Sequence, residues 1–108
     1  MSRAPRAGRR RAKAKPGHYL LRLFVVGDGP NSKLAAANLR SLCREHLNGR
    51  CTVETIDVGK NFAAALRDNI LITPALVLIA PLPRVTVLGN LSDRQKVLLA
   101  LRLLEGDS

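Results

Sequence analysis

Ile70-Leu71-Ile72-Thr73-Pro74-Ala75-Leu76-Val77-Leu78-Ile79-Ala80 is the stretch that decides the fold, because a proline divides it and an unbroken apolar run follows. A continuous apolar run of this kind is typical of a strand that is buried on both faces, near the centre of a sheet. Proline has no N–H to donate to a neighbouring strand, so the hydrogen-bonded ladder must begin after Pro74. We therefore predict a central strand over residues 75–80.

The sequence before this stretch begins with a strand and a long helix. Residues 19–26 (Tyr-Leu-Leu-Arg-Leu-Phe-Val-Val) are typical of a mostly buried strand. A helix is expected to follow, with Asn31 or Ser32 as its cap, and to run to about Leu47. Asn48-Gly49 then ends the helix, since either residue tolerates a left-handed backbone.

The remaining elements complete one α/β domain. Residues 51–58 alternate enough between polar and apolar side chains to predict a strand at the edge of the sheet, and a short helix is expected over residues 61–67. Strand, helix, strand in this order predicts a parallel pair with a right-handed crossover. A turn at Pro81-Leu82-Pro83 leads into a strand over 84–88 and a last helix over 92–104. The predicted order is β-α-β-α-β-β-α.

Most of the positive charge lies at the N-terminus. The chain has 18 Lys and Arg against 8 Asp and Glu, yet its first acidic residue is Asp28. Residues 1–17 contain seven of the basic residues and almost nothing to bury, so a disordered tail is expected, followed by a folded domain over residues 18–108. Such a tail could neutralise nucleic-acid phosphates, but it lacks interleaved aromatic residues that would stack on bases. Nucleic-acid binding is therefore an alternative function, assigned to Arg9, Arg10, Arg11, Lys13 and Lys15.

Few side chains offer catalytic or metal chemistry. Cys43 and Cys51 lack the C-x-x-C spacing of a redox pair, and two thiols without a histidine cluster cannot complete a zinc site. Neither His18 nor His46 has a visible partner for general-base catalysis. We expect no enzymatic activity, no metal and no cofactor, and two small half-buried cysteines. No apolar run approaches the ~18 residues of a membrane span, and no secretory signal is visible, so a cytoplasmic protein is expected.

Six motifs follow one another along the chain without a detectable gap. They are Leu23-Phe24-Val25-Val26-Gly27, Pro30-Asn31-Ser32, Val53-Glu54-Thr55-Ile56-Asp57-Val58, Ile70-Leu71-Ile72-Thr73-Pro74-Ala75-Leu76, Pro81-Leu82-Pro83-Arg84 and Gly89-Asn90-Leu91-Ser92-Asp93-Arg94-Gln95-Lys96-Val97-Leu98. In this order, over residues 19–104, they resemble the KaiB family of bacterial clock proteins. The resemblance implies an α/β, thioredoxin-like fold with a mixed four-stranded sheet and helices on both faces. It also implies a cis peptide bond between Thr73 and Pro74.

The resemblance implies a protein that binds a partner and is not an oxidoreductase. Thioredoxins carry two cysteines at the start of the first helix, where the helix dipole lowers a thiol pKa, and the corresponding stretch here is Asp28-Gly29-Pro30-Asn31. The implied partner is KaiC, a ring-shaped ATPase and autokinase, bound on its N-terminal ATPase ring. Clock members also capture KaiA and displace a histidine kinase with a KaiB-like domain, so a sensing module of a kinase pathway is an alternative role. The implied interface residues are Val58, Lys60, Asn61, Asp68 and Asn69.

The chain departs from cyanobacterial clock members at three basic positions. Leu34 and Asn69 stand where those members tend to carry Arg and Lys, and the basic pair expected after the proline turn is replaced by Arg84-Val85-Thr86. Charges at the rim of an interface tune partner choice and association rate more than the existence of binding. The departures therefore leave KaiC as the expected partner and argue against KaiA capture.

The last helix bears on a second family property, which is a switch between a self-associating form and the thioredoxin-like form. Ser92 and Gln95 match a capping box that predicts the start of this helix. Ala100 and Arg102 replace a common Gly and Asp, which favours the helix by about 1 kcal/mol for Ala over Gly and by ~0.3–1 kcal/mol for the charge near the helix C-terminus. We expect one continuous helix over residues 92–104. Together with Pro74, these two residues are expected to hold the chain in the thioredoxin-like form, as a monomer.

Overall fold

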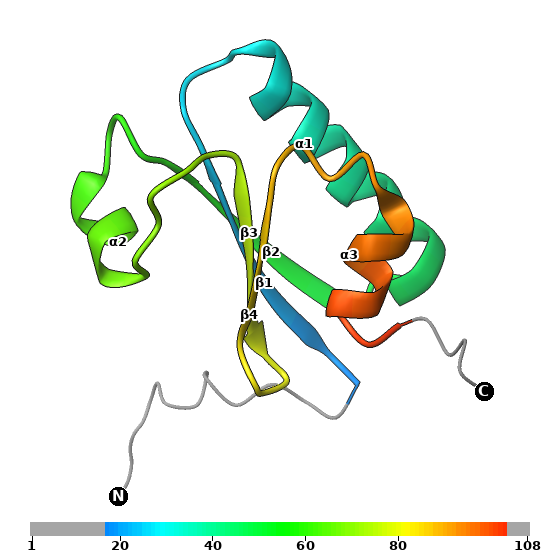
Figure 1. Cartoon of the computed structure of the whole chain (residues 1–108). Helices are drawn as coiled ribbons and strands as arrows, with labels where there is room; N and C mark the ends of the chain where they lie inside the picture. The colour runs from blue at the N-terminus through cyan, green and yellow to red at the C-terminus, as the bar shows by residue number, and fades with distance from the viewer. Residues whose placement is uncertain (1–16, 104–108) are drawn as a thin grey trace, which may run out of the picture.

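The strands and helices of the computed structural model, which describes residues 17–103, follow the predicted order (Figure 1). They are β1 (Tyr19–Val25), α1 (Pro30–Leu42), the π-helical turn η2 (Cys43–Leu47), β2 (Cys51–Asp57), α2 (Phe62–Arg67), β3 (Ala75–Ala80), β4 (Val85–Leu88) and α3 (Arg94–Ala100). The predicted basic tail lies, except for Gly17, outside the described residues. No helix within residues 17–103 is long and apolar enough to cross a membrane.

The sheet has four strands in the order β2-β1-β3-β4 within the described part of the chain. β1 and β2 are parallel, whereas β3 is antiparallel to both β1 and β4. The predicted edge position of residues 51–58 and the interior position of residues 75–80 are both confirmed. The register pairs Phe24 with Ile56 on one side and with Ala75 on the other. β1 therefore lies between the parallel strand β2 and the antiparallel strand β3.

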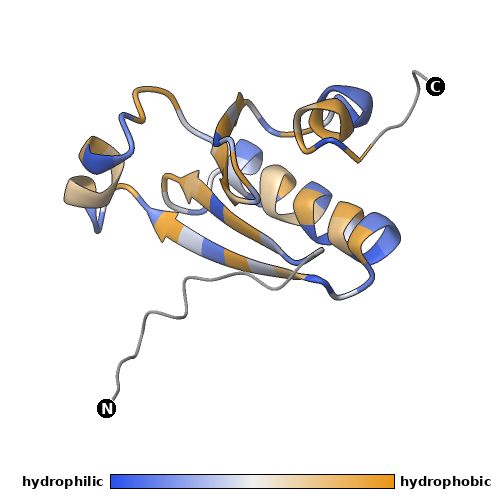
Figure 2. Cartoon of the chain, turned by 90° about the horizontal axis from the view of Figure 1, so that it is seen from below, coloured by the Kyte–Doolittle hydropathy of each residue, from blue (hydrophilic) through white to orange (hydrophobic). Residues whose placement is uncertain are grey.

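Helices cover both faces of the sheet, as predicted, but they cover them unequally. α1 and α3 lie on one face and α2 on the other (Figure 1). Because side chains alternate along β1, Leu21 and Leu23 pack in the core under α1 and α3, whereas Phe24 packs in the cluster under α2. Figure 2 shows hydrophobic (orange) and hydrophilic (blue) residues along both the strands and the helices. The first face buries a core rich in leucine. The second buries a smaller cluster, made of Phe24, Ile56, Ala64, Ala65, Ala75 and Val77.

The start of α1 differs from the prediction, although its end agrees. Gly29 is the N-cap and Pro30 the first helical residue, so neither Asn31 nor Ser32 caps the helix. Proline suits this position because its missing N–H would have no partner there. The hydroxyl of the buried Ser32 instead bonds to the N–H and C=O of Val26, each at 3.2 Å. At the other end, Asn48 is left-handed (φ 48°), as predicted, after the π-helical turn η2.

The last helix was wrongly predicted at both ends. Asp93, not Ser92, is its N-cap, and the Asp93 carboxylate accepts a 3.2 Å hydrogen bond from the N–H of Lys96. The helix ends at Ala100 and is not continuous over 92–104, because Arg102 adopts a left-handed backbone (φ 59°). The N–H groups of Arg102 and Leu103 donate to the carbonyls of Leu99 and Leu98, at 3.0 and 2.8 Å. This bonding pattern is a Schellman motif, which usually has Gly where Arg102 stands.

The prolines flanking β3 adopt cis peptide bonds. The predicted cis bond between Thr73 and Pro74 is confirmed, and the bonds preceding Pro81 and Pro83 are also cis. Pro74 is buried at the start of β3, and its carbonyl accepts a 2.8 Å hydrogen bond from the N–H of Gly89.

Candidate partner-binding surface

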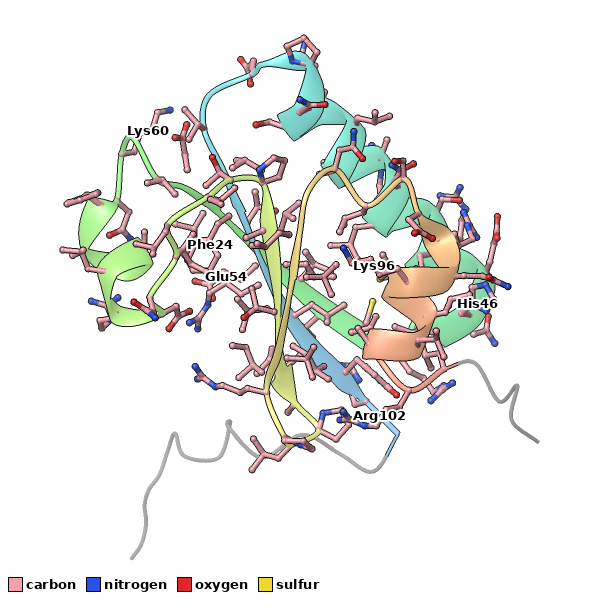
Figure 3. The ribbon with its side chains drawn as sticks, in the orientation of Figure 1. Phe24, His46, Glu54, Lys60, Lys96 and Arg102 are labelled. Carbon is pink, nitrogen blue, oxygen red and sulfur yellow. The ribbon has the colours of Figure 1, made fainter. Side chains whose placement is uncertain are left out.

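The segment that leads from β2 into α2 is held by short-range hydrogen bonds. A carboxylate oxygen of Asp57 accepts the N–H of Gly59 at 2.9 Å, and the Asp57 carbonyl accepts the N–H of Lys60 at 2.9 Å. Asn61 then caps α2, since its side-chain oxygen accepts the N–H of Ala64 at 3.1 Å. These contacts leave the exposed Lys60 side chain at the tip of the connection (Figure 3).

α2 turns two alanines toward the sheet and two large apolar side chains toward solvent. Ala64 and Ala65 are buried, whereas Phe62 is 63% exposed and Leu66 61% exposed. Because residues four apart lie on one face of a helix, Phe62 and Leu66 form a neighbouring apolar pair. We refer to Lys60, Phe62 and Leu66 as the α2 surface. Exposed large apolar groups next to polar residues mark protein-interaction sites more often than single exposed leucines do.

A hollow adjoins the C-terminal end of α2. It has a volume of about 400 Å³ and lies between the segment after α2 and the edge strand β4. The exposed Leu71 and Ile72 line one side, Thr86 and Leu88 the other, with Asp68 and Asn69 beside them. The apolar lining therefore extends from the end of α2 to the edge of the sheet.

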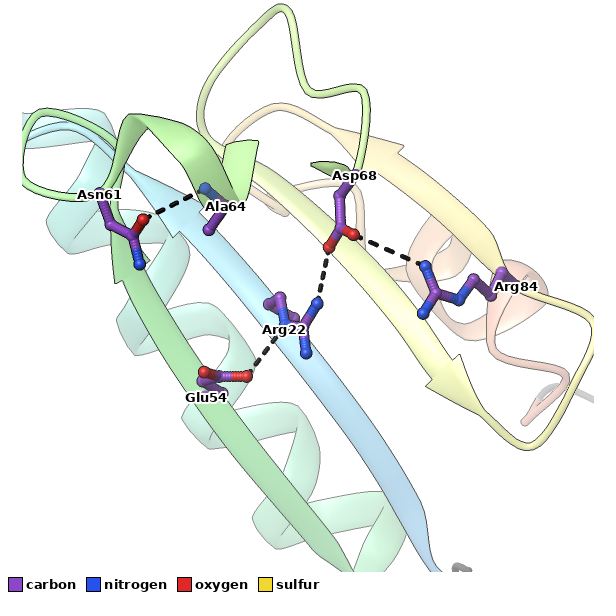
Figure 4. Close-up of polar contacts among 6 residues, drawn as sticks. All are labelled: Arg22, Glu54, Asn61, Ala64, Asp68 and Arg84. Atoms are coloured by element: carbon purple, nitrogen blue, oxygen red, sulfur yellow. Dashed lines mark hydrogen bonds and ion pairs between the residues drawn. The ribbon is translucent and has the colours of Figure 1, made fainter. Parts of the chain in front are cut away.

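A charge network fixes the end of α2 to the sheet (Figure 4). Arg22 on β1 donates from Nε to Glu54 on β2 at 2.9 Å and from Nη1 to Asp68 at 2.8 Å. Arg84 lies 3.7 Å from the other carboxylate oxygen of Asp68, whose side chain is only 8% exposed. Burial alone would lower the pKa of Arg22, but its hydrogen bonds to Asp68 and Glu54 outweigh this effect and raise the pKa. Arg22 therefore stays charged and holds Asp68 in place.

The structure gathers the five residues implied for the interface around α2, with different surroundings. Lys60 is exposed, and Asn69, which is left-handed (φ 59°), lines the hollow. The side chains of Asn61 and Asp68 are engaged in the cap and in the charge network, and Val58 packs against the smaller core. Sequence reasoning missed Phe62 and Leu66. Their four-residue spacing around three alanines was the available signal.

Thioredoxins carry two cysteines at the start of the first helix. The corresponding stretch of this chain, Asp28-Gly29-Pro30-Asn31, has none. The two thiols lie at the other end of α1, on η2 and at the start of β2. A 2.9 Å hydrogen bond joins Nε2 of His18 to the Thr52 hydroxyl, and His46 is exposed. Among residues 17–103, no three His, Cys, Asp or Glu side chains are grouped as metal ligands.

The comparison with known proteins agrees with this architecture. The KaiB domain matches residues 22–103. The chain belongs to the KaiB family. It is 43% identical over 89 residues to the circadian clock oscillator protein KaiB of a Synechococcus strain, covering 82% of this chain and 87% of the relative. It is also 43% identical over 86 residues to the protein of the same name from Microcystis aeruginosa, covering 80% of this chain and 83% of that protein.

Solved structures establish the thioredoxin-like fold of this KaiB-family chain. The N-terminal domain of Synechococcus elongatus SasA is 25% identical, with a TM-score of 0.67, over 98% of this chain and 97% of the domain. The thioredoxin Deadhead of Drosophila melanogaster is 18% identical, with a TM-score of 0.66, over 89% of this chain and 90% of Deadhead. The second likeness concerns the fold alone. The fold class predicted from the sequence is confirmed.

Proposed function

We propose that this chain is a non-enzymatic, cytoplasmic KaiB-family protein that binds the N-terminal ATPase ring of a KaiC-type hexamer and modulates its activity or output. The family membership supports this proposal, and one feature of the structure carries it. α2 turns Phe62 and Leu66 outward beside Lys60, although nothing in the fold itself requires large apolar groups there. Burial of these side chains against a partner would supply the binding free energy.

The size of the effect follows from area. Complete burial of a leucine side chain is worth about 1.5–3 kcal/mol, and about 1.4 kcal/mol changes a dissociation constant tenfold. Leu66→Ala should therefore weaken the complex by roughly tenfold. Lys60→Glu should slow association and make it less sensitive to salt, as expected for a charge at the rim.

A matched control exists on the opposite face of the sheet. Leu99 on α3 is 59% exposed, against 61% for Leu66, so Leu99→Ala removes the same atoms at the same exposure. Binding should be measured by biolayer interferometry against a KaiC-type hexamer with ATP present. Loss of affinity in Leu66→Ala but not in Leu99→Ala supports the α2 surface. Equal effects in the two variants would move the interface away from α2.

A histidine kinase pathway is the second candidate. The likeness to the SasA N-terminal domain extends over nearly the whole chain, and the family resemblance implies that clock members displace a histidine kinase with a KaiB-like domain. Capture from native lysate, with ATP present and with Leu66→Ala as the negative control, distinguishes the two partners. The nucleic-acid alternative rests on the basic residues of the tail, and a steep salt dependence that disappears on deletion of residues 1–17 would favour it.

A further inference from the structure

The turn between η2 and β2 brings together Cys43 and Cys51, although their spacing in the sequence matches no redox motif. Three backbone hydrogen bonds shape this turn. The N–H of Asn48 donates to the Cys43 carbonyl at 2.9 Å, that of Arg50 to the Leu47 carbonyl at 2.7 Å, and that of Tyr19 to the Arg50 carbonyl at 2.8 Å. The last bond places Arg50 beside the start of β1, where Cys51 begins β2 and pairs with Tyr19.

Both cysteines line one groove between α1 and the edge strand β2. The groove has a volume of about 390 Å³, and its other walls include Leu39, Val53 and Arg40. It opens along the free edge of β2, where no further strand pairs within the described residues. A small solute can therefore approach the pair from this side.

The two thiols differ in accessibility and in acidity. Cys43 is buried at 9% exposure, whereas Cys51 is half-buried at the first position of β2. Burial raises the pKa of Cys43 to about 12, and the neighbouring Cys51 thiol contributes to the rise. Since the thiolate is the nucleophile in disulfide exchange, Cys43 is a poor first attacker.

We propose that Cys43 and Cys51 form a reversible thiol–disulfide site, in which Cys51 first exchanges with a small disulfide such as glutathione disulfide and Cys43 then resolves the adduct. In the first step the Cys51 thiol loses its proton to solvent and its sulfur bonds to one glutathione sulfur. The glutathione S–S bond breaks, and one glutathione leaves as a thiolate. In the second step Cys43 loses its proton to solvent and attacks the Cys51 sulfur. The second glutathione leaves, and both leaving groups are protonated. The protein pair is oxidised and glutathione disulfide is reduced to two glutathione molecules.

The order of events follows from the contacts. Once the Cys51 sulfur is bonded to glutathione it no longer carries a proton or a charge, so its contribution to the raised pKa of Cys43 disappears, while burial, the larger cause, continues to raise that pKa. The resulting disulfide would link η2 to the first residue of β2 across the Asn48-Gly49 turn. It would lie at the far end of β2 from the α2 surface, so this proposal does not depend on the proposed partner.

Intact-mass spectrometry of the full chain tests the proposal. After incubation with glutathione disulfide and acid quenching, the native protein should lose two hydrogen atoms and carry no glutathione, and dithiothreitol should restore its original mass. Cys43→Ser should instead accumulate one stable glutathione adduct at Cys51, since nothing resolves it. Cys51→Ser should remain unmodified under the same conditions, because Cys43 is buried.

Two results would overturn the proposal. One is a stable glutathione adduct on the native protein, which would show that Cys43 does not reach Cys51. The other is modification of Cys51→Ser as rapidly as of Cys43→Ser, which would show that Cys43 reacts through opening of the core. Cys43→Ala provides a second resolving-thiol variant should the serine disturb packing, and circular dichroism verifies that each variant is folded.

Discussion

Arg102 bonds to Pro81 across the end of the sheet. Its Nη2 donates to the Pro81 carbonyl at 2.9 Å and to the Leu82 carbonyl at 3.3 Å. Arg102, whose left-handed backbone prevents α3 from continuing, therefore also holds the turn between β3 and β4. Figure 3 shows Arg102 beside this turn, at the opposite end of the molecule from Lys60. Arg102 therefore contacts a neighbouring turn and does not continue the helix.

The pair Ala100→Gly and Arg102→Asp should weaken the thioredoxin-like form. Glycine at the last helical position costs up to about 1 kcal/mol, and each lost hydrogen bond costs about 0.5–1.5 kcal/mol. A total near 2 kcal/mol changes a two-state ratio about thirtyfold. Solution NMR of the free protein should show residues 94–100 as one helix in the native chain and a second, slowly exchanging set of signals in the double variant. A single unchanged set of signals would contradict the assigned role.

The same pair should change the kinetics of association with a KaiC-type ATPase. The native chain has the thioredoxin-like fold, which we expect to be the form that binds, so association should be single-phased, whereas the double variant should add a slow phase. Arg102→Gly is the control that separates the two contributions at this position, because glycine relieves the left-handed backbone but removes the bonds to Pro81 and Leu82. A slow phase in Arg102→Gly would assign the effect to the lost hydrogen bonds, because glycine itself favours the left-handed backbone.

Sequence reasoning succeeded where one residue type dictates one local structure. The unbroken apolar run of β3, the proline before it and the left-handed Asn48 after η2 each leave few alternatives. It failed at helix ends, where several residues compete. At α3, Asp93 is the N-cap, where Ser92 was predicted. The left-handed backbone of Arg102 could not be predicted, because arginine seldom adopts this conformation.

The resemblance predicts an interface around α2, and this remains a prediction. The five implied residues do surround α2, yet the side chains of Asn61, Asp68 and Val58 are engaged within the fold. The charge network of Asp68 joins residues far apart in the sequence, and no local pattern predicts it. No local pattern predicts that Cys43 and Cys51 line the same groove either, because their spacing matches no redox motif.

The network around Asp68 should contribute to stability. Asp68→Asn removes a nearly buried carboxylate that accepts from Arg22 and should lower the free energy of unfolding by about 1–3 kcal/mol. Glu54→Gln is the matched control, since Glu54 pairs with the same arginine but is exposed, and exposed pairs are worth about 0–1 kcal/mol. Urea denaturation at neutral pH measures both. Equal losses in the two variants would mean that burial of Asp68 has no consequence.

The ion pair between Glu45 and Arg94 should contribute to the pH dependence of the free energy of unfolding at acid pH. A hydrogen bond to Arg94, which joins η2 to α3, lowers the pKa of Glu45. A carboxyl with a depressed pKa in the folded state stabilises the fold above its unfolded pKa, and this contribution is lost as the pH falls through the folded pKa. Glu45→Gln should therefore make stability less dependent on pH on the acid side. An unchanged slope, measured by thermal melts across that range, would show that the pair is solvent-screened.

The chain should not catalyse disulfide reduction. No cysteine stands at Asp28-Gly29-Pro30-Asn31 before and within the first turn of α1, and the high pKa of Cys43 makes it a poor attacking thiol. Insulin reduction by dithiothreitol should proceed at the rate of the blank. Turnover above the blank that disappears in Cys43→Ser or Cys51→Ser would refute this expectation, whereas stoichiometric oxidation of the pair would not.

The unequal packing of the two sheet faces also sets which part of the molecule opens first. α2 is a short helix held by two alanines and by the bonds at its ends, whereas α1 packs leucines into the larger core. Short elements with small buried side chains open locally at a lower free energy than the rest of a domain. The amides of α2 should therefore exchange with solvent deuterium well before those of α1. A protein that binds the α2 surface would suppress this opening, and its footprint would be slowed exchange confined to α2 in an otherwise unchanged molecule.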